Sequence, residues 1–292
     1  MLNPRDFYCF LITMNLKRQI KAILLVVLIT LLIDGCSYNN EEQLQSFQIA
    51  FLDIGQGDAT LVMCNGKTML IDTGDRSHIY SLERYLDEFK IKKIDYLVIT
   101  HPDNDHLGGI NAAFDLDVGN VYCSSYKNET SEYKDFVDVC KKANKRIIVP
   151  EKNSSFNLGA AKVEVLAVDT DINNSNDSSI VLMIHVGDTK FLMTGDADKA
   201  TEMYLMENYD DLSCDVLKVP HHGAYNMVTG MFLRRVNPDY AVISVGANNS
   251  YNHPTENVVD ILNTTSKKLF ITSVDHTIIF TSDGYKVSYT IR

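Results

Sequence analysis

The stretch Ile99-Thr100-His101-Pro102-Asp103-Asn104-Asp105-His106-Leu107-Gly108-Gly109 decides the fold of this chain. Two histidines and two aspartates fall within six residues, directly after the apolar run Tyr96–Ile99. Such a run followed by a polar loop predicts a strand whose carboxyl end carries functional side chains. Imidazole and carboxylate groups at this density suit Zn²⁺ or a similar borderline cation better than cations that take only oxygen ligands. The alternative is a charged loop capped by Asp105, but a helix cap does not require two imidazoles.

Further short motifs occur in a fixed order on both sides of this stretch. They are Leu-Asp-Ile-Gly-Gln-Gly-Asp-Ala at 52–59, Asp-Thr-Gly at 72–74, Thr-Gly-Asp at 194–196, Pro-His-His-Gly at 220–223 and Asn-His-Pro at 252–254. Together they resemble the metallo-β-lactamase superfamily, with Asp103 where the middle histidine of the first motif usually stands. The variant His-Pro-Asp-x-Asp-His is similar to the hydrolase domain of ComEC-type competence proteins, and the resemblance covers roughly residues 46–291.

The resemblance implies an α/β fold of the αββα sandwich type and a centre of two divalent metal ions, Zn²⁺ or Mn²⁺. We expect Asp196 to bridge the two ions. The expected ligands of one ion are His101, Asp103 and Asp196, and those of the other are Asp105, His106, Asp196 and His253.

Other residues are expected to support the centre. Asp72 is assigned hydrogen bonds that orient an imidazole, with a plain turn carboxylate as the alternative. Asp58 lies at a strand end after Gly55 and Gly57, where the backbone must approach closely. The superfamily's histidine about twenty residues before Thr-Gly-Asp is missing, so either Asn176 or Asp177, next to Ser178, substitutes for it or that metal site is weak.

Two adjacent histidines, His221 and His222, end a predicted strand. If the strand geometry continues, only one of them points inward, and we favour His222. Either one could protonate a leaving alkoxide or stabilise developing charge, and Asp105, besides binding metal, could orient the nucleophilic water. We interpret His185, in mid-strand, as an ordinary strand histidine and His276 as a loop histidine.

The expected activity is that of a metal-dependent hydrolase in which a metal-bound hydroxide attacks an ester-like centre. The ComEC resemblance implies a phosphodiesterase or DNase, with a small phosphodiester or single-stranded DNA as substrate. A carboxylic ester, lactone or lactam hydrolase is the alternative enzyme, and a non-catalytic, membrane-tethered binding module is the alternative of another class. The multi-span channel of ComEC proteins has no counterpart in these residues, so we do not expect DNA transport.

The composition and charge of the chain limit how it could bind a nucleic-acid substrate. The chain has 292 residues, 45% of them hydrophobic, which is enough for one large domain with a sizeable core. Its formal net charge is −11. A basic nucleic-acid footprint is therefore missing, and a polyanionic substrate would depend on the metal ions and a few local cations.

The N-terminus has the pattern of an export signal. Lys17, Arg18 and Lys21 precede the apolar run 22–33, which is short for a bilayer span. An aliphatic residue followed by x-Gly-Cys then resembles a bacterial lipobox with Cys36 as the lipidated residue, and an uncleaved membrane anchor is the alternative. We expect 1–36 to be this signal or anchor, 37–45 a polar linker and 46–292 the hydrolase domain, exported and held at the extracytoplasmic face of the membrane or secreted.

Secondary structure is expected from periodicity. Strands are predicted at 47–52, 60–64, 67–71, 94–99, 118–123, 146–149, 163–168, 178–186, 190–193, 214–219, 239–245, 268–272, 277–281 and 285–291. Helices are predicted at 77–90, from about 107, at 131–144, 198–208 and 255–262. The four cysteines beyond residue 36 show no metal-binding spacing, which favours buried free thiols over disulfides. The oligomeric state is not predictable from this pattern.

Overall fold

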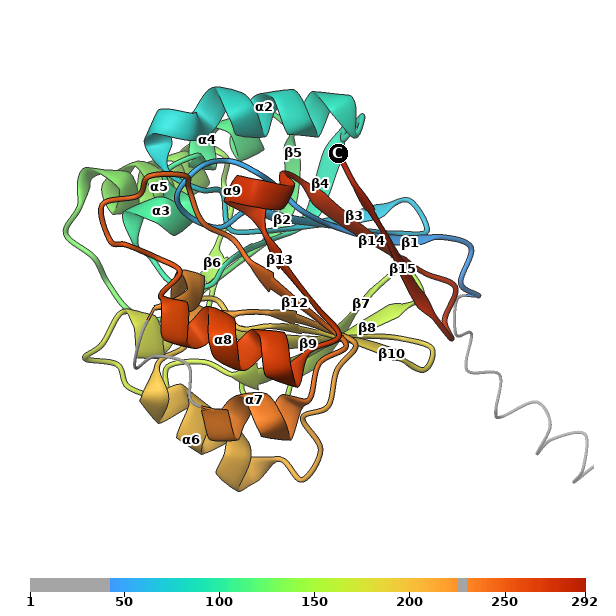
Figure 1. Cartoon of the computed structure of the whole chain (residues 1–292). Coiled ribbons are helices and arrows are strands. Elements are labelled where there is room, and N and C mark those ends of the chain that lie inside the picture. Colours follow the sequence, from blue (N-terminus) through green and yellow to red (C-terminus); the bar gives the residue numbers. More distant parts are fainter. Residues whose placement is uncertain (1–42, 225–229) are drawn as a thin grey trace, which may run out of the picture. The chain divides into compact units, whose positions relative to one another are not determined.

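The computed structural model describes residues 43–224 and 230–292, so the expected segment 1–36 and most of the expected linker lie outside the described residues. The described chain forms two β-sheets packed face to face, each covered on its outer face by helices (Figure 1). This arrangement confirms the predicted αββα sandwich.

The first sheet has eight strands in the order β15-β14-β1-β2-β3-β4-β5-β6. Its strands are β1 (Phe47–Phe51), β2 (Thr60–Cys64), β3 (Lys67–Ile71), β4 (Lys93–Ile99), β5 (Asp117–Cys123), β6 (Ile147–Ile148), β14 (Ile278–Ser282) and β15 (Val287–Ile291). The predicted turn between β2 and β3 is confirmed: Asn65 and Gly66 both have positive φ, as a tight hairpin turn requires.

The second sheet has seven strands in the order β13-β12-β11-β10-β9-β8-β7. They are β7 (Ser155–Leu158), β8 (Ala161–Ala167), β9 (Val181–Val186), β10 (Thr189–Met193), β11 (Val216–Lys218), β12 (Tyr240–Ile243) and β13 (Lys268–Ile271). Strands β10 to β13 are parallel to one another, as are β3 to β6 in the first sheet. The loops at the carboxyl ends of these parallel strands carry the motifs that the sequence singled out.

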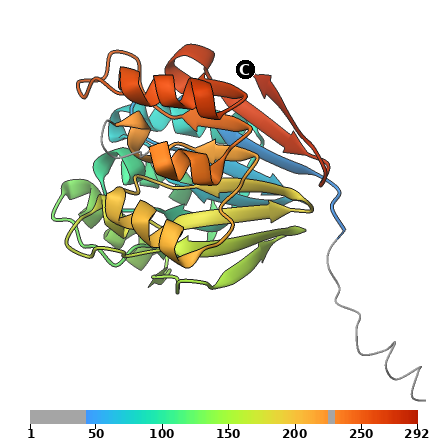
Figure 2. The same ribbon diagram turned by 60° about the horizontal axis from the view of Figure 1, so that its bottom comes forward.

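Helices pack on the outer faces of both sheets (Figures 1 and 2). The first sheet is covered by α2 (Ile79–Glu88), α4 (Ile110–Phe114) and α5 (Ser131–Lys142), and the second by α6 (Lys199–Asn208), α7 (Gly230–Val236) and α8 (Glu256–Thr265). Two single-turn helices, α3 (Asn104–Leu107) and α9 (Thr272–Asp275), follow β4 and β13. In the described parts of the chain, we find no helix with both the length and the apolar character needed to cross a bilayer.

The core between the sheets is rich in aromatic side chains. Phe270 of β13 and Phe280 of β14 are fully buried, and their ring centroids lie 5.7 Å apart in a T-shaped contact. Phe47 and Phe191 make a similar contact between β1 and β10 at 4.9 Å. These contacts bury large apolar areas between the two sheets and thereby fix the loops of one sheet relative to those of the other.

Several elements differ from the sequence-based expectations. The helix expected from about residue 107 already begins at Asn104, inside the proposed metal loop. The strand expected from Ser178 begins at Val181, because the Ser178 hydroxyl donates to the carbonyl of Ser175 and residues 176–178 form a 3₁₀ turn. Strand β7 and helix α7 were not expected, since β7 is only four residues long and mostly uncovered.

Candidate metal centre

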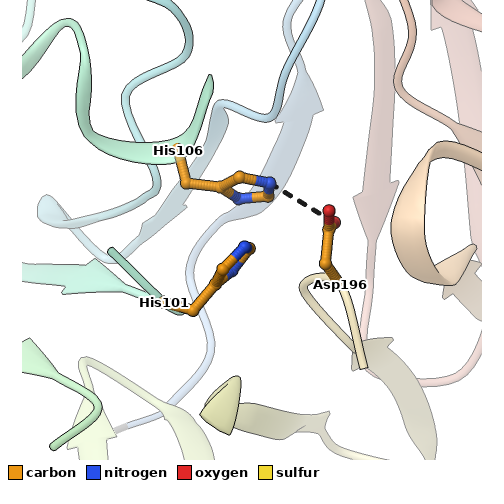
Figure 3. A group of neighbouring side chains, drawn as sticks. All are labelled: His101, His106 and Asp196. Carbon is orange, nitrogen blue, oxygen red and sulfur yellow. Dashed lines mark ion pairs between the residues drawn. The ribbon is translucent and has the colours of Figure 1, made fainter. Parts of the chain in front are cut away.

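The candidate site lies where loops from both sheets meet. Asp72 follows β3, the stretch 100–106 follows β4, Asp196 follows β10, and His221 and His222 follow β11. Figure 3 shows His101, His106 and Asp196 pointing toward one another. These strands are parallel within each sheet, so their carboxyl ends meet at one edge of the sandwich.

Ligand-type atoms converge in four overlapping groups of three, and within each group the atoms lie within 4.8 Å of one another. The groups are His101–His106–Asp196, Asp105–His106–His222, Asp58–Asp196–His222 and Asp58–Asp72–His106. Asp196 connects the groups, because its Oδ1 lies 3.3 Å from His106 Nε2 and its Oδ2 lies 3.3 Å from His222 Nε2. This is the position expected of a carboxylate shared by two cations.

Asp72 makes the supporting contacts that the sequence analysis expected. Its carboxylate accepts hydrogen bonds from the Thr100 backbone N–H and hydroxyl, both at 2.7 Å, and contacts His106 Nδ1 at 2.8 Å. With Nδ1 engaged in this way, the Nε2 atom of His106 is directed toward Asp196 and is available as a ligand atom.

His222, the histidine that the sequence analysis favoured, lies in the cluster, and His221 lies at its edge. His221 and His222 have φ values of 47° and 53°, and the extended geometry assumed for them therefore ends at Val219. The His222 Nδ1–H donates to the Ser244 carbonyl at 2.9 Å, while its Nε2 lies 3.3 Å from Asp105 Oδ2. His221 Nε2 lies 3.9 Å from Asp196 Oδ2.

The structure places the members of the expected second group, Asp105–His106–Asp196–His253, differently: the first three lie in the cluster, whereas His253 lies beside it with its buried Nδ1 lacking a hydrogen-bond partner. None of the groups of three found among the described residues includes His253, and His222 occupies the place expected for it beside Asp105. The His253 ring instead packs against that of His221, with centroids 5.8 Å apart. The positive φ angles after β11 bring His222 into the cluster, and they could not be read from the pattern of apolar residues.

Asp103 lies at the rim of the cluster. Its Oδ2 is 3.5 Å from His101 Nε2, whereas its Oδ1 accepts from the Ser175 hydroxyl at 2.6 Å and from the Asn128 amide at 3.2 Å. One oxygen therefore faces His101 while the other is tied to neighbouring loops. Asp103 belongs to none of the four groups of three described above.

The residues expected to replace the missing histidine make contacts outside the four groups of the cluster. Asp177 does not face the cluster, because its Oδ1 accepts from the backbone N–H groups of Asp198 and Thr201 at the start of α6. The expectation that Asp177 might substitute is therefore corrected. Asn176 Nδ2 lies 3.4 Å from His221 Nδ1, and the Ser178 hydroxyl contacts the Ser175 carbonyl in its own turn and the Ser124 hydroxyl after β5.

Ser179 was not singled out from the sequence. Its hydroxyl lies 3.4 Å from His101 Nδ1 and accepts from the Asp196 backbone N–H at 3.2 Å. It thus connects the first metal motif to the bridging carboxylate. A serine beside other serines in an Asn-rich loop carries no pattern that would have identified it.

Lys218 is the second residue that the sequence analysis missed. Its Nζ forms an ion pair with Asp58 Oδ2 at 2.6 Å, and both side chains are buried. The other oxygen of Asp58 lies 3.6 Å from His222 Nδ1, so the pair lies directly behind the cluster. A lysine between Leu217 and Val219 in a buried strand was the available signal, because a fully buried charge is rare unless it is paired.

The donor set fits divalent cations. Six buried imidazole and carboxylate atoms in and beside the cluster have no hydrogen-bond partner among the described residues, namely Asp58 Oδ1, His101 Nε2, His106 Nε2, Asp196 Oδ1, His222 Nε2 and His253 Nδ1. Buried polar atoms without partners are unfavourable, and a cation bound between them would remove that penalty. Nitrogen and carboxylate ligands together suit Zn²⁺ or Mn²⁺.

Electrostatic coupling within the cluster is strong. Burial disfavours the charged form of His222, but Asp196 and Asp105 outweigh this and raise its pKa to about 10. In the same way, burial is outweighed by Asp196 and Asp72 in raising the pKa of His106 well above its usual value. Although burial opposes it, His222 and His106 hold the pKa of Asp196 well below its usual range. Without cations, protons on the imidazoles thus balance the carboxylates.

Comparisons with known proteins agree with this geometry. The family model described as "Metallo-beta-lactamase superfamily" matches residues 52–247. The chain is 28% identical over 256 residues to ComE operon protein 3 of Bacillus subtilis and 30% identical over 231 residues to competence protein ComA of Neisseria gonorrhoeae. The matches cover 79% and 78% of this chain but only 32% and 31% of those proteins, so the chain spans about a third of their length.

A solved structure shows the same fold. The metallo-β-lactamase fold protein YhfI from Bacillus subtilis superimposes with a TM-score of 0.55 at 12% identity, covering 82% of this chain and all of that one. The CmlA β-hydroxylase E377D mutant gives a TM-score of 0.52 over 78% of this chain and 52% of its own.

The buried ion pair behind His222 can be tested by substitution. We expect Lys218→Met to lower the free energy of unfolding by about 3–5 kcal/mol, because it leaves the Asp58 carboxylate buried without a counter-charge. The double variant Asp58→Asn/Lys218→Met should recover most of this loss. Urea denaturation measures both, and a double variant no more stable than Lys218→Met would contradict the pairing.

The stability of the chelator-treated protein should depend on pH in a defined direction. The pKa of His222 is raised from the ordinary histidine value of 6.5 to about 10. The contribution of protonated His222 to the stability of the folded protein is therefore fully present below pH 6.5 and is lost as the pH rises toward 10. The melting temperature should therefore fall between pH 7 and pH 9.5. Excess Zn²⁺ or Mn²⁺ should remove this decline, since cations bind neutral imidazole. A metal-free melting temperature that is constant or rises across this range would refute the assignment.

Proposed function

The chain belongs to the metallo-β-lactamase superfamily, and on that premise we propose that it is a metal-dependent phosphodiesterase whose substrate is single-stranded DNA or a smaller nucleotide phosphodiester. The observation that carries the proposal is the convergence of buried, unpartnered imidazole and carboxylate atoms from both sheets. The names of the relatives support the substrate class, because they refer to competence, as in competence protein ComA, and to recombination, as in recombination protein 2 of Haemophilus influenzae.

The residues divide into two ligand sets. His101, Asp103 and Asp196 would hold one cation, and Asp105, His106, His222 and Asp196 the other. When bound, such cations polarise a phosphoryl group and lower the pKa of water. Hydrolysis adds water across one P–O ester bond and gives a phosphomonoester and an alcohol.

His221 has a separate role in this proposal. Its ring is about a fifth exposed and lies at the edge of the cluster, with Nε2 3.9 Å from Asp196 Oδ2 and Nδ1 3.4 Å from the Asn176 amide. From this position it can donate a proton to the leaving alkoxide oxygen. Asn176, which the sequence analysis considered as a substitute metal ligand, would instead orient the His221 ring through its side-chain amide.

The activity can be tested with bis-p-nitrophenyl phosphate and single-stranded DNA in the presence of Mn²⁺ or Zn²⁺. We expect His106→Ala to reduce turnover by ~100-fold or more, since it removes a ligand atom that belongs to three of the four groups of the cluster. His185→Ala is the matched control, because this histidine pairs with Glu164 on the second sheet and should leave the rate unchanged. Hydrolysis of a lactam or lactone but of no phosphodiester, or no turnover with any substrate, would overturn the proposal.

We also propose that the protein acts at the extracytoplasmic face of the membrane, held there through Cys36. The lipobox-like sequence supports this, as do relatives named for competence, but the segment lies outside the described residues. Replacing Cys36 by Ala should shift the protein from the membrane fraction to the soluble fraction of cells. An unchanged distribution would contradict lipid anchoring.

A further inference from the structure

A short loop after β12 presents an exposed aromatic ring beside the metal centre. This loop, residues 246–253, is closed by the side chain of Asn249. The Asn249 Oδ1 accepts from the backbone N–H groups of Tyr251 and His253, at 3.1 and 3.0 Å. Its Nδ2 donates to the carbonyls of Gly246 and His253, at 3.0 and 2.6 Å. Four hydrogen bonds from one side chain fix the loop conformation and hence the positions of its rings.

The rings of this loop connect the cluster to the surface. Tyr251 is stacked on His253, with centroids 5.7 Å apart and planes 24° apart. His253 in turn packs edge-on against His221 at 5.8 Å. His221 contacts the bridging carboxylate of Asp196, so three successive rings lead outward from the site. Tyr251, at the outer end, is 63% exposed.

Exposure alone does not distinguish this tyrosine. Tyr80 on α2 and Tyr285 between β14 and β15 are each 79% exposed. Tyr251 differs because one face of its ring is supported by His253 in a rigid loop next to the candidate centre. A supported, exposed ring at the edge of a site is the type of surface on which nucleobases stack.

The charge of the protein favours such a contact. The formal net charge is −11, so long-range attraction contributes little to holding a nucleic-acid backbone. The centroid distances from His221 to His253 and from His253 to Tyr251 are 5.8 and 5.7 Å, so the Tyr251 ring lies within about 12 Å of His221, which a base a few nucleotides from a phosphate at the cluster can reach. Cations at the phosphate and stacking of a base can then supply affinity for the substrate.

We propose that Tyr251 stacks a nucleobase of the substrate, so that the site selects nucleotide phosphodiesters over phosphodiesters without bases. The inference rests on the proposed function for the position of the phosphate. His253 and Asn249 are positioning residues in this arrangement: the first supports the ring and the second fixes the loop.

A binding test is possible because the chain contains no tryptophan. Tyr251→Trp introduces a single fluorophore at the proposed contact, and Tyr285→Trp is the matched control at an exposed tyrosine elsewhere. We expect a short oligothymidylate, long enough to reach from the cluster to position 251, to quench the Tyr251→Trp fluorescence saturably in the presence of Mn²⁺, and an abasic oligonucleotide of equal length not to do so. Neither ligand should affect Tyr285→Trp. Absence of quenching at position 251, or equal quenching in both variants, would overturn the proposal.

A kinetic test uses oligothymidylate and an abasic oligonucleotide of equal length. Tyr251→Ala should lower the preference for oligothymidylate, measured as the ratio of the two kcat/KM values, by about 5- to 150-fold. Tyr251→Phe should retain the preference, because it keeps the ring. An unchanged ratio in Tyr251→Ala would refute stacking. If the wild-type protein cleaves neither substrate, the proposed function fails, whereas the fluorescence titration still decides whether bases stack on this ring.

Discussion

The site depends on how the Asp72 carboxylate ties three groups of the metal loop together. It accepts from the Thr100 N–H and hydroxyl and engages His106 Nδ1. Asp72 itself is held at the end of β3 by a hydrogen bond from its own N–H to the Val98 carbonyl at 2.8 Å. The register between β3 and β4 therefore sets the direction of the His106 ring. The contact between Asp72 and His106 Nδ1 thus directs the ring toward Asp196, which follows a strand of the other sheet.

Close backbone packing supports the same loop from a second direction. A Cβ atom on Gly57 would lie 2.1 Å from the Asp105 carbonyl oxygen, so only glycine allows this approach. The neighbouring Asp58 N–H donates to that carbonyl at 3.1 Å, and the Asp58 side chain pairs with Lys218. The glycine-rich turn thus brings a neutral, buried ion pair behind His222 while it holds the start of α3. Because the pair carries no net charge, it adds little to the repulsion among the acidic groups in front of it.

Local signals in the sequence were sufficient for much of the fold. The alternation of residues 47–71 and the Asn65-Gly66 turn predict the first three strands, because these strands pair with their neighbours along the chain. The density of His and Asp at 101–106 likewise predicts the position of the candidate centre. The placement of His221 and His222 depended instead on backbone angles after β11, which nonlocal packing sets. The contacts of Asp177 with α6 and of Lys218 with Asp58 also join distant segments, so no short pattern could predict them.

The ligand groups are divided between the two halves of the chain. Asp105 and His106 come from the first half and belong to the first sheet, whereas Asp196 and His222 come from the second half and the second sheet. The residues up to the end of β9 contain Asp105 and His106 but not Asp196 or His222. The complete cluster therefore needs β10 and β11 paired in the second sheet and the two sheets packed together. The full set of candidate ligands therefore requires both halves of the chain to be folded.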